Sequence, residues 1–391
     1  MTTEIQNLYK RKPPAETILV GGLQAASPPF LSSVFPALRS CGRLLTPTCE
    51  ELKMWSLFDR GDQSPTVPTM QGLNRTSLSL RVLLALTLCA FLSESVHRLS
   101  AQETGSSFGG SWDLTLHGTP RNLPSWINVS NVNGKLKLTF VGVTDHATWM
   151  KDAKIVHGEL TFVSPKGQEG FDADTTYTLR RVGDGLEGSA KNSSQSWSIV
   201  GKHAPSFANE TVAQWGQPTK LFDGKDFDGW KFSDPANSHW KIENGDLVNT
   251  GHGAEIITLA KFDNFKLHLE FNAAPVSNSG VFLRGRYEVQ IETDSVAEPP
   301  SHHTGGVYGF LDPIPEQPRL PDHWQTLDIT FVGRTITVVQ NGITVIQNKV
   351  IPGITGGALD SDEGSPGPIY LQGSEKGRVA YRNIVITPAK G

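Results

Sequence analysis

Most of the side chains that could do chemistry lie in one short stretch, residues 278–292, which reads NSGVFLRGRYEVQIE. Its last six residues alternate between apolar and polar side chains, and successive side chains of a β-strand point to opposite faces. Glu288, Gln290 and Glu292 therefore share one face, while the apolar residues between them face a core. Such a row of long polar groups suits the floor of a groove for a polar ligand such as a sugar, although an ordinary solvated sheet face shows the same pattern.

An arginine precedes this strand. By alternation Arg284 lies on the same face as Phe282, and a turn or bulge is predicted at Gly285-Arg286. Arg284 either pairs with Glu288 across that turn or faces a ligand, and the spacing allows both.

The composition narrows the class of protein. The 391 residues carry a formal net charge of -4, with no basic excess that would suggest nucleic acid and no acidic tail. The 39 glycines and 25 prolines, together with short alternating segments, favour an all-β, turn-rich chain of two or three domains. Cys41, Cys49 and Cys89 all precede residue 100, so the mature chain is expected to lack a disulfide, a thiol nucleophile and a cysteine metal site.

Residues 70–101 are predicted to be a signal peptide. Arg75 and Arg81 precede the apolar run 82–92, and the small residue Ala101 offers a cleavage site. The run is too short to span a bilayer, which needs about 20 residues. We therefore expect export to the periplasm or the outside of the cell, without stable membrane insertion.

Residues 106–204 are predicted to form a small antiparallel β-barrel or sandwich. Turn residues such as Asn133-Gly134 and Gly183-Asp184-Gly185 separate its alternating segments. The segments are 112–116, 135–140, 155–162, 176–180 and 196–200. Its tryptophans either stack on sugars or pack in a core; they are Trp112, Trp126, Trp149 and Trp197.

Residues 205–219 are predicted to be a linker, and residues 220–391 a second β-domain. Asn341-Gly342 between two alternating segments is a strong hairpin signal. Strands of this number and length imply two packed antiparallel sheets. The predicted strands are 265–273, 279–283, 287–292, 325–332, 335–340, 343–348, 369–372 and 379–387.

The second domain also carries a series of motifs in a fixed order. They are Leu221-Phe-Asp-Gly-Lys-Asp226 with Gly229-Trp230, Trp240-Lys-Ile-Glu-Asn-Gly-Asp-Leu247, Asn278-Ser-Gly-Val-Phe-Leu-Arg-Gly285, Tyr287-Glu-Val-Gln-Ile291, Gly305-Gly-Val-Tyr-Gly309, Gly367-Pro-Ile-Tyr-Leu-Gln-Gly373 and Tyr381-Arg-Asn-Ile-Val385. Together they resemble the DUF1080 family, also called the 3-keto-disaccharide hydrolase domain, over nearly all of residues 220–388. The resemblance implies an all-β, concanavalin-like jelly-roll sandwich. Residues 106–204 more weakly resemble small β-domains that precede this domain in some bacterial proteins.

The resemblance implies chemistry on glycosides already oxidised at C3 of the sugar. A C3 ketone makes the C2 proton acidic, because the resulting carbanion delocalises as an enolate. A base removes that proton, the glycosidic oxygen leaves C1, and water then adds to the unsaturated sugar. The sequence predicts cleavage or hydration of 3-keto-glycosides without separating the two half-reactions.

The resemblance also suggests roles for particular side chains. Glu288 or Glu292 would be the base, and Arg284 would stabilise the oxyanion or position hydroxyls. His303, or its neighbour His302, would shuttle a proton, since imidazole titrates near neutral pH. Further substrate-binding residues are Asn278, Gln290, His302, Tyr308 and Trp324, with Trp230 and Trp240 as stacking faces. Each residue also has a structural reading, as an ion pair, a solvated loop histidine or a core tryptophan.

The metal content stays open. Residues 360–363, DSDE, supply the oxygen ligands that Ca²⁺ uses but lack the glycine of an EF-hand loop. Glu292, Asp294, His302 and His303 could gather a divalent ion that polarises the ketone, although their spacing does not demand one. No other cofactor is expected.

Two other functions compete with this reading. Laminarinase-like retaining glycosidases carry Glu-x-Asp-x-Glu on one strand, and Glu288-Val-Gln-Ile-Glu292 has glutamine in the central place. The strand rise separates the two glutamate Cα atoms by ~13 Å, whereas retaining chemistry needs carboxyl groups ~5–5.5 Å apart. The second alternative is a lectin-like glycan-binding module without catalysis.

The oxidation that makes a 3-keto-sugar must happen elsewhere. The sequence contains no nicotinamide-binding fingerprint, so a separate sugar 3-dehydrogenase is expected in the same pathway.

A signal peptide should begin a chain, so we predict that translation starts at Met70 and that residues 1–69 are an unstructured extension absent from the native protein. Mass spectrometry or N-terminal sequencing of the native protein should find no peptide from residues 1–69. Recovery of such peptides would contradict this start.

Overall fold

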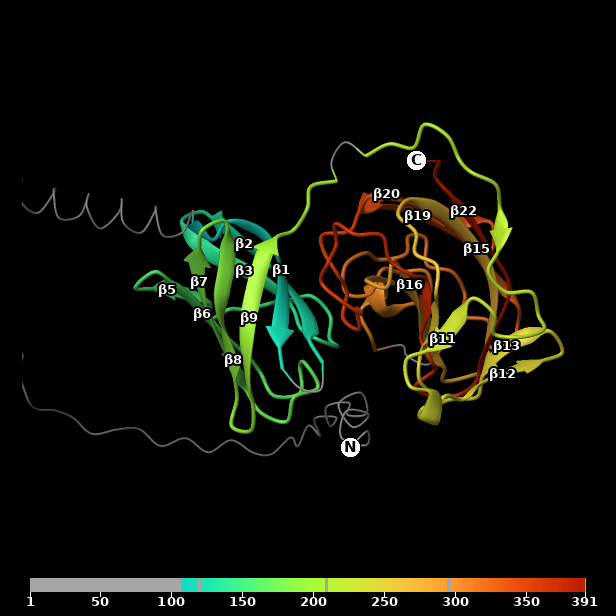
Figure 1. Cartoon of the computed structure of the whole chain (residues 1–391), viewed down its shortest axis with the longest axis horizontal. Coiled ribbons are helices and arrows are strands. Elements are labelled where there is room, and N and C mark those ends of the chain that lie inside the picture. The colour runs from blue at the N-terminus through green and yellow to red at the C-terminus, as the bar shows by residue number, and fades with distance from the viewer. Residues whose placement is uncertain (1–106, 119–120, 208–209, 294–296, 391) are drawn as a thin grey trace, which may run out of the picture. The chain divides into compact units, whose positions relative to one another are not determined.

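The computed structural model describes residues 107–118, 121–207, 210–293 and 297–390 (Figure 1). The proposed start at Met70 and the apolar run 82–92 lie outside these residues. The regular secondary structure of these residues is almost entirely β-strand, with turns, irregular loops and two short 3-10 helices, η2 (Pro235–Asn237) and η3 (Pro300–His302), between the strands. Within it, no helix is long and apolar enough to cross a membrane.

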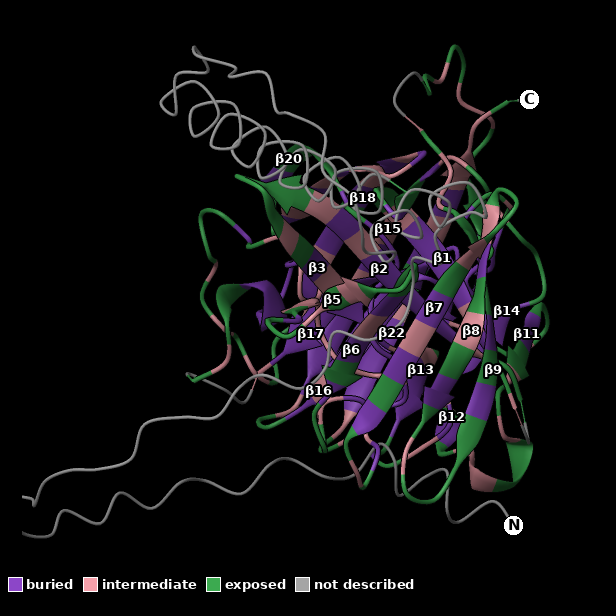
Figure 2. Ribbon diagram, turned by 90° about the vertical axis from the view of Figure 1, so that its left-hand side faces the viewer, coloured by how far each residue is buried: buried purple, intermediate pink, exposed green. Residues whose placement is uncertain are grey.

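Nine antiparallel strands form the first sheet, which curls around its own core (Figure 1). The order is β4-β3-β2-β1-β9-β8-β7-β6-β5, so each strand lies beside a neighbour in sequence except where β1 meets β9. Buried and exposed residues alternate along β7, β8 and β9 (Figure 2), because one face packs inside and the other meets solvent. The strands are β1 (Gly110–His117), β2 (Leu123–Val132), β3 (Lys135–Val141), β4 (Thr148–Trp149), β5 (Lys154–Val156), β6 (Glu159–Ser164), β7 (Thr175–Val182), β8 (Gly185–Lys191) and β9 (Ser196–His203).

Two turns of this sheet bear on the predicted strands: one confirms a predicted hairpin, and the other divides a segment predicted as a single strand. Asn133 and Gly134 both have positive φ, as the predicted two-residue hairpin turn requires. The single strand predicted over 155–162 is wrong, because His157 (φ 52) and Gly158 (φ 81) form a turn between β5 and β6. The His-Gly pair was the overlooked signal.

Two further antiparallel sheets contain the second group of strands. The eight-stranded sheet runs β12-β13-β22-β15-β18-β19-β20, with β10 also beside β22, and the five-stranded sheet runs β11-β14-β21-β16-β17. The first comprises β10 (Thr219–Lys220), β12 (Trp240–Glu243), β13 (Asp246–Asn249), β15 (Phe265–Ala273), β18 (Gln325–Val332), β19 (Thr335–Gln340), β20 (Ile343–Val350) and β22 (Val379–Pro388). The second comprises β11 (Trp230–Phe232), β14 (Ile256–Thr258), β16 (Asn278–Leu283), β17 (Tyr287–Glu292) and β21 (Tyr370–Leu371).

These two sheets share one apolar core and form the expected all-β sandwich. Inward-facing residues of both belong to one buried cluster, and the Tyr287 ring lies 5.2 Å from the Phe331 ring across the interior. The predicted hairpin is present, with Asn341 and Gly342 at positive φ between β19 and β20.

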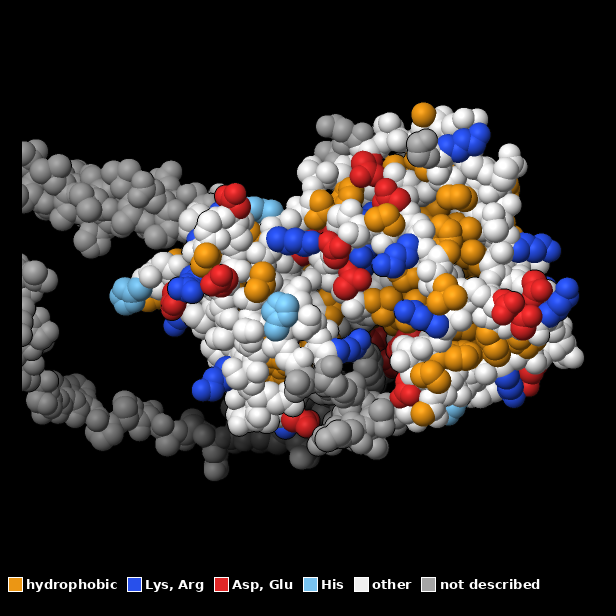
Figure 3. Space-filling view, viewed as in Figure 1, with side chains coloured by type: hydrophobic (Ala, Val, Ile, Leu, Met, Phe, Trp, Pro, Cys, Tyr) orange, Lys and Arg blue, Asp and Glu red, His pale blue; other side chains and the backbone are white. Residues whose placement is uncertain are grey.

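Most tryptophans are core residues. Trp112, Trp126, Trp197, Trp230 and Trp240 are buried, so their proposed use as stacking platforms gives way to packing, whereas Trp149 is exposed. Over the face drawn in Figure 3, acidic and basic side chains are interspersed, in line with 35 basic and 39 acidic residues in the chain.

Trp126 and Val141 of the first sheet pack into the core cluster of the second group. The Trp126 ring makes an edge contact with Phe310 at 5.9 Å. Gly353 leaves room for the indole, since a Cβ there would come within 2.3 Å of the ring. The two groups of strands are thus joined by apolar packing as well as by the chain.

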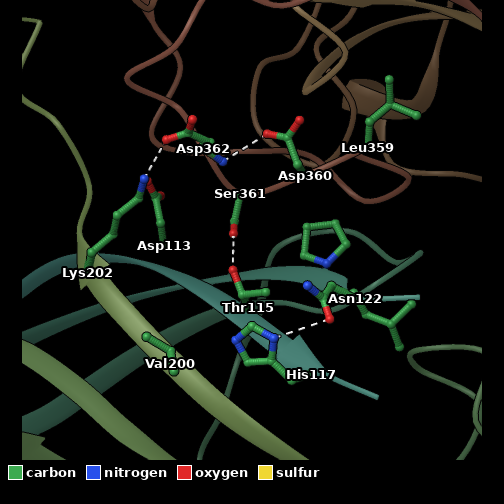
Figure 4. A pocket seen from close by; sticks show the side chains of 12 residues that line it. Asp113, Thr115, His117, Asn122, Val200, Lys202, Leu359, Asp360, Ser361 and Asp362 are labelled. Atoms are coloured by element: carbon green, nitrogen blue, oxygen red, sulfur yellow. Dashed lines mark hydrogen bonds and ion pairs between the residues drawn. The ribbon is translucent and has the colours of Figure 1, made fainter. Parts of the chain in front are cut away.

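Polar contacts surround a pocket of about 400 Å³ between the outer face of β1 and β9 and residues 359–362 (Figure 4). Lys202 pairs with Asp362 at 2.5 Å, and Thr115 shares a hydrogen bond of 2.7 Å with Ser361. Both contacts link the first sheet to the second group of strands.

A buried acid lines this pocket. Asp113 is 1% exposed, and burial together with the neighbouring Glu363 carboxylate raises its pKa to about 9. Lys202 and Arg334 act in the opposite direction. The pair is most stable when Asp113 holds a proton, because two adjacent buried carboxylates repel each other.

This raised pKa makes folding stability depend on pH. Between the ordinary pKa of 3.8 and the folded value of about 9, the folded state binds more protons than the unfolded state, so stability falls as pH rises. Asp113→Asn, which mimics the protonated acid, should therefore raise Tm more at pH 8 than at pH 5. We expect a difference of at least about 2 °C, since 1 kcal/mol shifts Tm by roughly 2–4 °C in a domain of about 150–250 residues.

The Tm of the wild type and of Asp113→Asn would be measured at pH 5 and pH 8 by thermal unfolding followed by circular dichroism. Asp184→Asn, in an exposed turn, is the control. Equal pH dependence of Asp113→Asn and wild type would show that Asp113 is not the titrating group.

Candidate functional site

The hairpin of β16 and β17 sets out the predicted polar row. Tyr287, Val289 and Ile291 belong to the sandwich core, and the three polar residues that alternate with them face the other way. The row is covered, however, not open to solvent. Glu288, Gln290 and Glu292 are 4%, 2% and 7% exposed, so the alternative of an ordinary solvated face does not apply.

Residues 304–308 cover the free edge of β17. The amide of Gln290 donates to the Gly306 carbonyl, the amide of Gly305 donates to the Gln290 carbonyl, and the amide of Tyr308 donates to the Glu288 carbonyl, all within 3.1 Å. These bonds fix the strand against the loop that follows His302 and His303 and carries Tyr308.

A glycine diagonal to Glu288 on the neighbouring strand makes room for its carboxyl group. Glu288 pairs with Phe282 and Gln290 pairs with Gly280, and the carboxyl group leans diagonally over Gly280. A Cβ on Gly280 would lie 2.1 Å from Glu288 Oε1. The backbone at Glu288 is held as well, since its amide donates to Thr355 Oγ1 at 3.1 Å.

Glu288 is a buried acid whose charged form is disfavoured. Burial is the main cause that raises its pKa well above the ordinary value, and the charges of Glu375 and Glu292 add to the effect. No basic group contributes to the shift of this pKa. Glu288 therefore keeps its proton to a much higher pH than a surface glutamate does.

Glu375 and Asn278 lie at the other end of the row. Asn278 pairs with Glu292 between the strands, and its side-chain amide donates to Glu375 Oε2 at 3.4 Å. The Glu375 amide in turn donates to the Asn278 carbonyl at 3.0 Å. We call Glu288, Glu292 and Glu375 the acid cluster.

Tyr308 and His302 stack beside the acid cluster. Their rings lie 4.3 Å apart and 29° from parallel. His302 Nδ1 lies 3.3 Å from the Glu298 carboxylate, yet burial lowers the pKa of His302 below its usual value. His302 is therefore held as neutral imidazole near neutral pH.

His303 points to different partners. Its Nδ1 lies 2.8 Å from Glu316 Oε1, and its Nε2 lies 3.2 Å from the Glu298 carbonyl. Of the two predicted histidines, His302 is the one that contacts Tyr308.

Arg284 is not brought to Glu288. It occupies the hairpin turn with φ 53, is fully buried, and ion-pairs with Asp263 at 3.3 Å. Its guanidinium also donates to the Glu363 and Ser365 carbonyls. Both readings from the sequence, a pair with Glu288 and a ligand contact, give way to a structural role: Arg284 ties residues 363–365 to the turn.

Trp324 is also placed elsewhere. Arg382 lies over its ring at 3.9 Å and pairs with Glu270 on the eight-stranded sheet. Glu270 alternates with the core residues Leu269 and Phe271, so this stack lies on the sheet face that points away from the core. Trp324 therefore supports that outer surface and is not joined to the acid cluster.

A segment of the first sheet approaches the histidine. His146 follows β3, and its ring makes an edge contact with His302 at 5.1 Å. Asp145 Oδ1 lies 2.5 Å from His146 Nδ1, and this hydrogen bond raises the pKa of His146. The pKa values of the two imidazoles are thus shifted in opposite directions, that of His146 upward and that of His302 downward.

Metal binding finds no ready-made site in the described chain. Across these residues, no group of three or more His, Cys, Asp or Glu has metal-binding geometry. Asp294, one of the predicted ligands, lies outside the described residues. Asp360 and Asp362 are instead engaged by Arg286 and Lys202, at 2.6 and 2.5 Å.

Sequence reasoning missed Glu375, Gly280, Asp145 and His146. Gly280 stands inside a motif already noted, and a glycine within a strand signals a close approach by another group. Glu375 and the Asp145-His146 pair come from loops far away in sequence, so no local pattern marks them.

Residues 217–387 match the family model of the 3-keto-alpha-glucoside-1,2-lyase-like domain. This part of the chain is therefore similar to that family. The match contains the acid cluster, Tyr308 and His302, and it confirms the resemblance drawn from the motifs. We call residues 217–387 the lyase-like domain.

A 3-keto-disaccharide hydrolase of Bacteroides thetaiotaomicron is 36% identical over 73 residues, which cover 16% of this chain and 25% of that protein. The chain thus spans a quarter of the length of the curated relative it matches. Among solved structures, a predicted glycosyl hydrolase of Parabacteroides distasonis is 27% identical, with a TM-score of 0.36, over 46% of this chain and 83% of its own. A galectin-like protein of unknown function from Bacillus subtilis is 12% identical, with a TM-score of 0.30, over 46% of this chain and 100% of its own.

The fit of Glu288 over Gly280 can be tested by stability. Gly280→Ala should destabilise the fold by about 1–3 kcal/mol, because the added methyl group overlaps the Glu288 carboxyl group. The loss should shrink when Glu288 is also replaced by alanine, so the double variant should lose less than the sum of the single ones. Urea unfolding of the four proteins measures this coupling.

Gly364→Ala is the matched control, since a Cβ at Gly364 meets open space. Strictly additive losses for Gly280→Ala and Glu288→Ala would contradict the proposed contact.

Proposed function

We propose that the lyase-like domain acts on glycosides whose C3 hydroxyl has been oxidised to a ketone, with Glu288 exchanging the C2 proton. The observation that carries the proposal is a buried carboxyl group with a strongly raised pKa, seated over a strand glycine inside the matched family region. A proton next to a ketone is a weak acid, so a carboxylate with a raised pKa is better suited to remove it than an ordinary one.

The proposed steps balance without an external oxidant. Glu288 takes the proton from C2, the electrons form the C1=C2 double bond, and the glycosidic oxygen leaves C1 with a proton. Addition of water to the unsaturated 3-keto-sugar would complete a net hydrolysis. Because the starting ketone requires an earlier oxidation, we propose a separate sugar 3-dehydrogenase upstream.

The surroundings suit a polar, uncharged substrate. Asn278, Gln290, Tyr308 and His302 offer hydrogen-bonding groups around the acid cluster, and Glu292 and Glu375 disfavour an anionic ligand there. The apolar run 82–92 also supports a proposal of export to the periplasm or the medium.

Turnover tests the proposal. The full chain is incubated with 3-keto-trehalose, 3-keto-sucrose, the same sugars unoxidised, and a β-1,3-glucan, and the products are followed by mass spectrometry. We expect cleavage of the keto-sugars alone. Cleavage of the plain glucan would favour a retaining glycosidase, and binding without turnover would favour a lectin; either result would overturn the proposal.

The role of Glu288 has its own signature. Glu288→Gln should lower kcat by at least about 10²-fold, the typical contribution of a general base. In the wild type kcat/KM should rise with pH, because a base with a raised pKa is ionised only at the higher pH. Glu187→Gln, at an exposed ion pair of the first sheet, is the control. An active Glu288→Gln variant would remove Glu288 from the reaction.

A further inference from the structure

The segment between β3 and β4 lies against two loops of the lyase-like domain. The Gly357 amide donates to the Val143 carbonyl at 2.9 Å. A Cβ on Gly356 would lie 2.5 Å from the Asp145 carbonyl, and one on Gly309 would lie 2.7 Å from His146 Cβ. Glycines at both points let the backbones meet, so this segment is seated closely on the loops that surround the site.

The contact places His146 at the end of a chain of groups that leads to Glu288. The His146 ring touches the His302 ring, the His302 ring stacks on Tyr308, and the Tyr308 amide is bonded to the Glu288 carbonyl. His146 is 39% exposed at its side chain, whereas His302 is 7% exposed. His146 is therefore the histidine of this row that a ligand and water can both reach.

We propose that His146 of the first sheet is the proton donor to the leaving alcohol, so that the first sheet completes the catalytic site of the lyase-like domain. This inference rests on the proposed function and adds the acid that it leaves unassigned. While Glu288 takes the C2 proton and the C1–O bond breaks, the leaving oxygen takes the proton from His146. Neutral His146 regains a proton from water before the next turnover.

The charges around the two histidines support this division of labour. Asp145 and Glu298 face His146, and the hydrogen bond to Asp145 raises its pKa. His302 faces His146, Glu298 and Asp145, and burial followed by the His146 charge lowers its pKa. Tyr308 separates the pair from Glu288. Neighbouring groups whose pKa values are pushed apart suit one acid and one neutral partner.

Residues 143–147 precede the family match, which begins at residue 217. The donor therefore comes from a part of the chain that the family model does not contain. The aglycone half of the substrate would lie toward the first sheet, and the oxidised sugar would lie over the acid cluster.

Leaving-group dependence tests the inference in the full chain. His146→Gln should lower kcat for cleavage of an alkyl 3-keto-glucoside by about 10²-fold, the usual effect of losing a general acid. The reason is that an alkoxide leaves poorly without a proton. For a 4-nitrophenyl 3-keto-glucoside, kcat should fall by less than about 5-fold, since nitrophenolate leaves without a proton. The fall in wild-type kcat at high pH should disappear in the variant. A merely structural histidine would slow both substrates equally.

His157→Asn, in an exposed turn of the same sheet, is the control, and circular dichroism verifies folding of each variant. A wild type that cleaves both substrates, with His146→Gln unchanged or equally impaired on both, would overturn the role of His146 and leave the proposed function standing. A wild type that cleaves neither substrate would overturn the proposed function and this role with it.

The order of protonation is a readout that needs no substrate. Imidazole titration by NMR, assigned with His146→Gln and His302→Gln, should show His146 holding its proton to a higher pH than His302. The reverse order would overturn the proposal. Asp145→Asn should lower the pKa of His146, because the main cause of its rise is the hydrogen bond that the imidazole donates to that carboxylate.

Discussion

The site depends on the burial of one carboxyl group. Glu288 sits in a sheet face from which water is largely excluded, beside two other acids, so its ionised form is costly. Its backbone is therefore pinned by Thr355 and by Tyr308, and Gly280 leaves space for the carboxyl group itself. In this environment Glu288 binds its proton more tightly than an ordinary surface glutamate does.

The first sheet is more than a neighbour of this arrangement. Trp126 joins the sandwich core, the 143–147 segment lies on the loops around the site, and the outer face of β1 and β9 meets residues 359–362. These contacts involve separate parts of the second group of strands, namely its core, the loops at Gly309 and Gly356, and residues 359–362. Apolar packing and polar contacts thus both hold the first sheet against the second group of strands.

Local sequence rules predicted the parts of the fold that local physics decides. The two-residue period of β17 gave the correct division between core and polar faces, and Asn341-Gly342 marked a real hairpin. The same rules failed for Arg284, because a left-handed turn residue no longer follows the strand alternation. Glu375 and His146 were out of reach for another reason, since only the tertiary fold brings loops from residues 143–147, 302–308 and 375 together.

The loop over β17 has a consequence for how the protein survives at high concentration. β17 ends the five-stranded sheet, and an unpaired strand edge is a template for pairing with other chains. Residues 304–308 occupy that edge by bonding to the backbone of Glu288, Gln290 and Glu292. One loop thus holds Tyr308 beside the acid cluster and also covers the strand edge on which aggregates could grow, so a substitution in residues 304–308 would disturb the candidate site and expose that edge together.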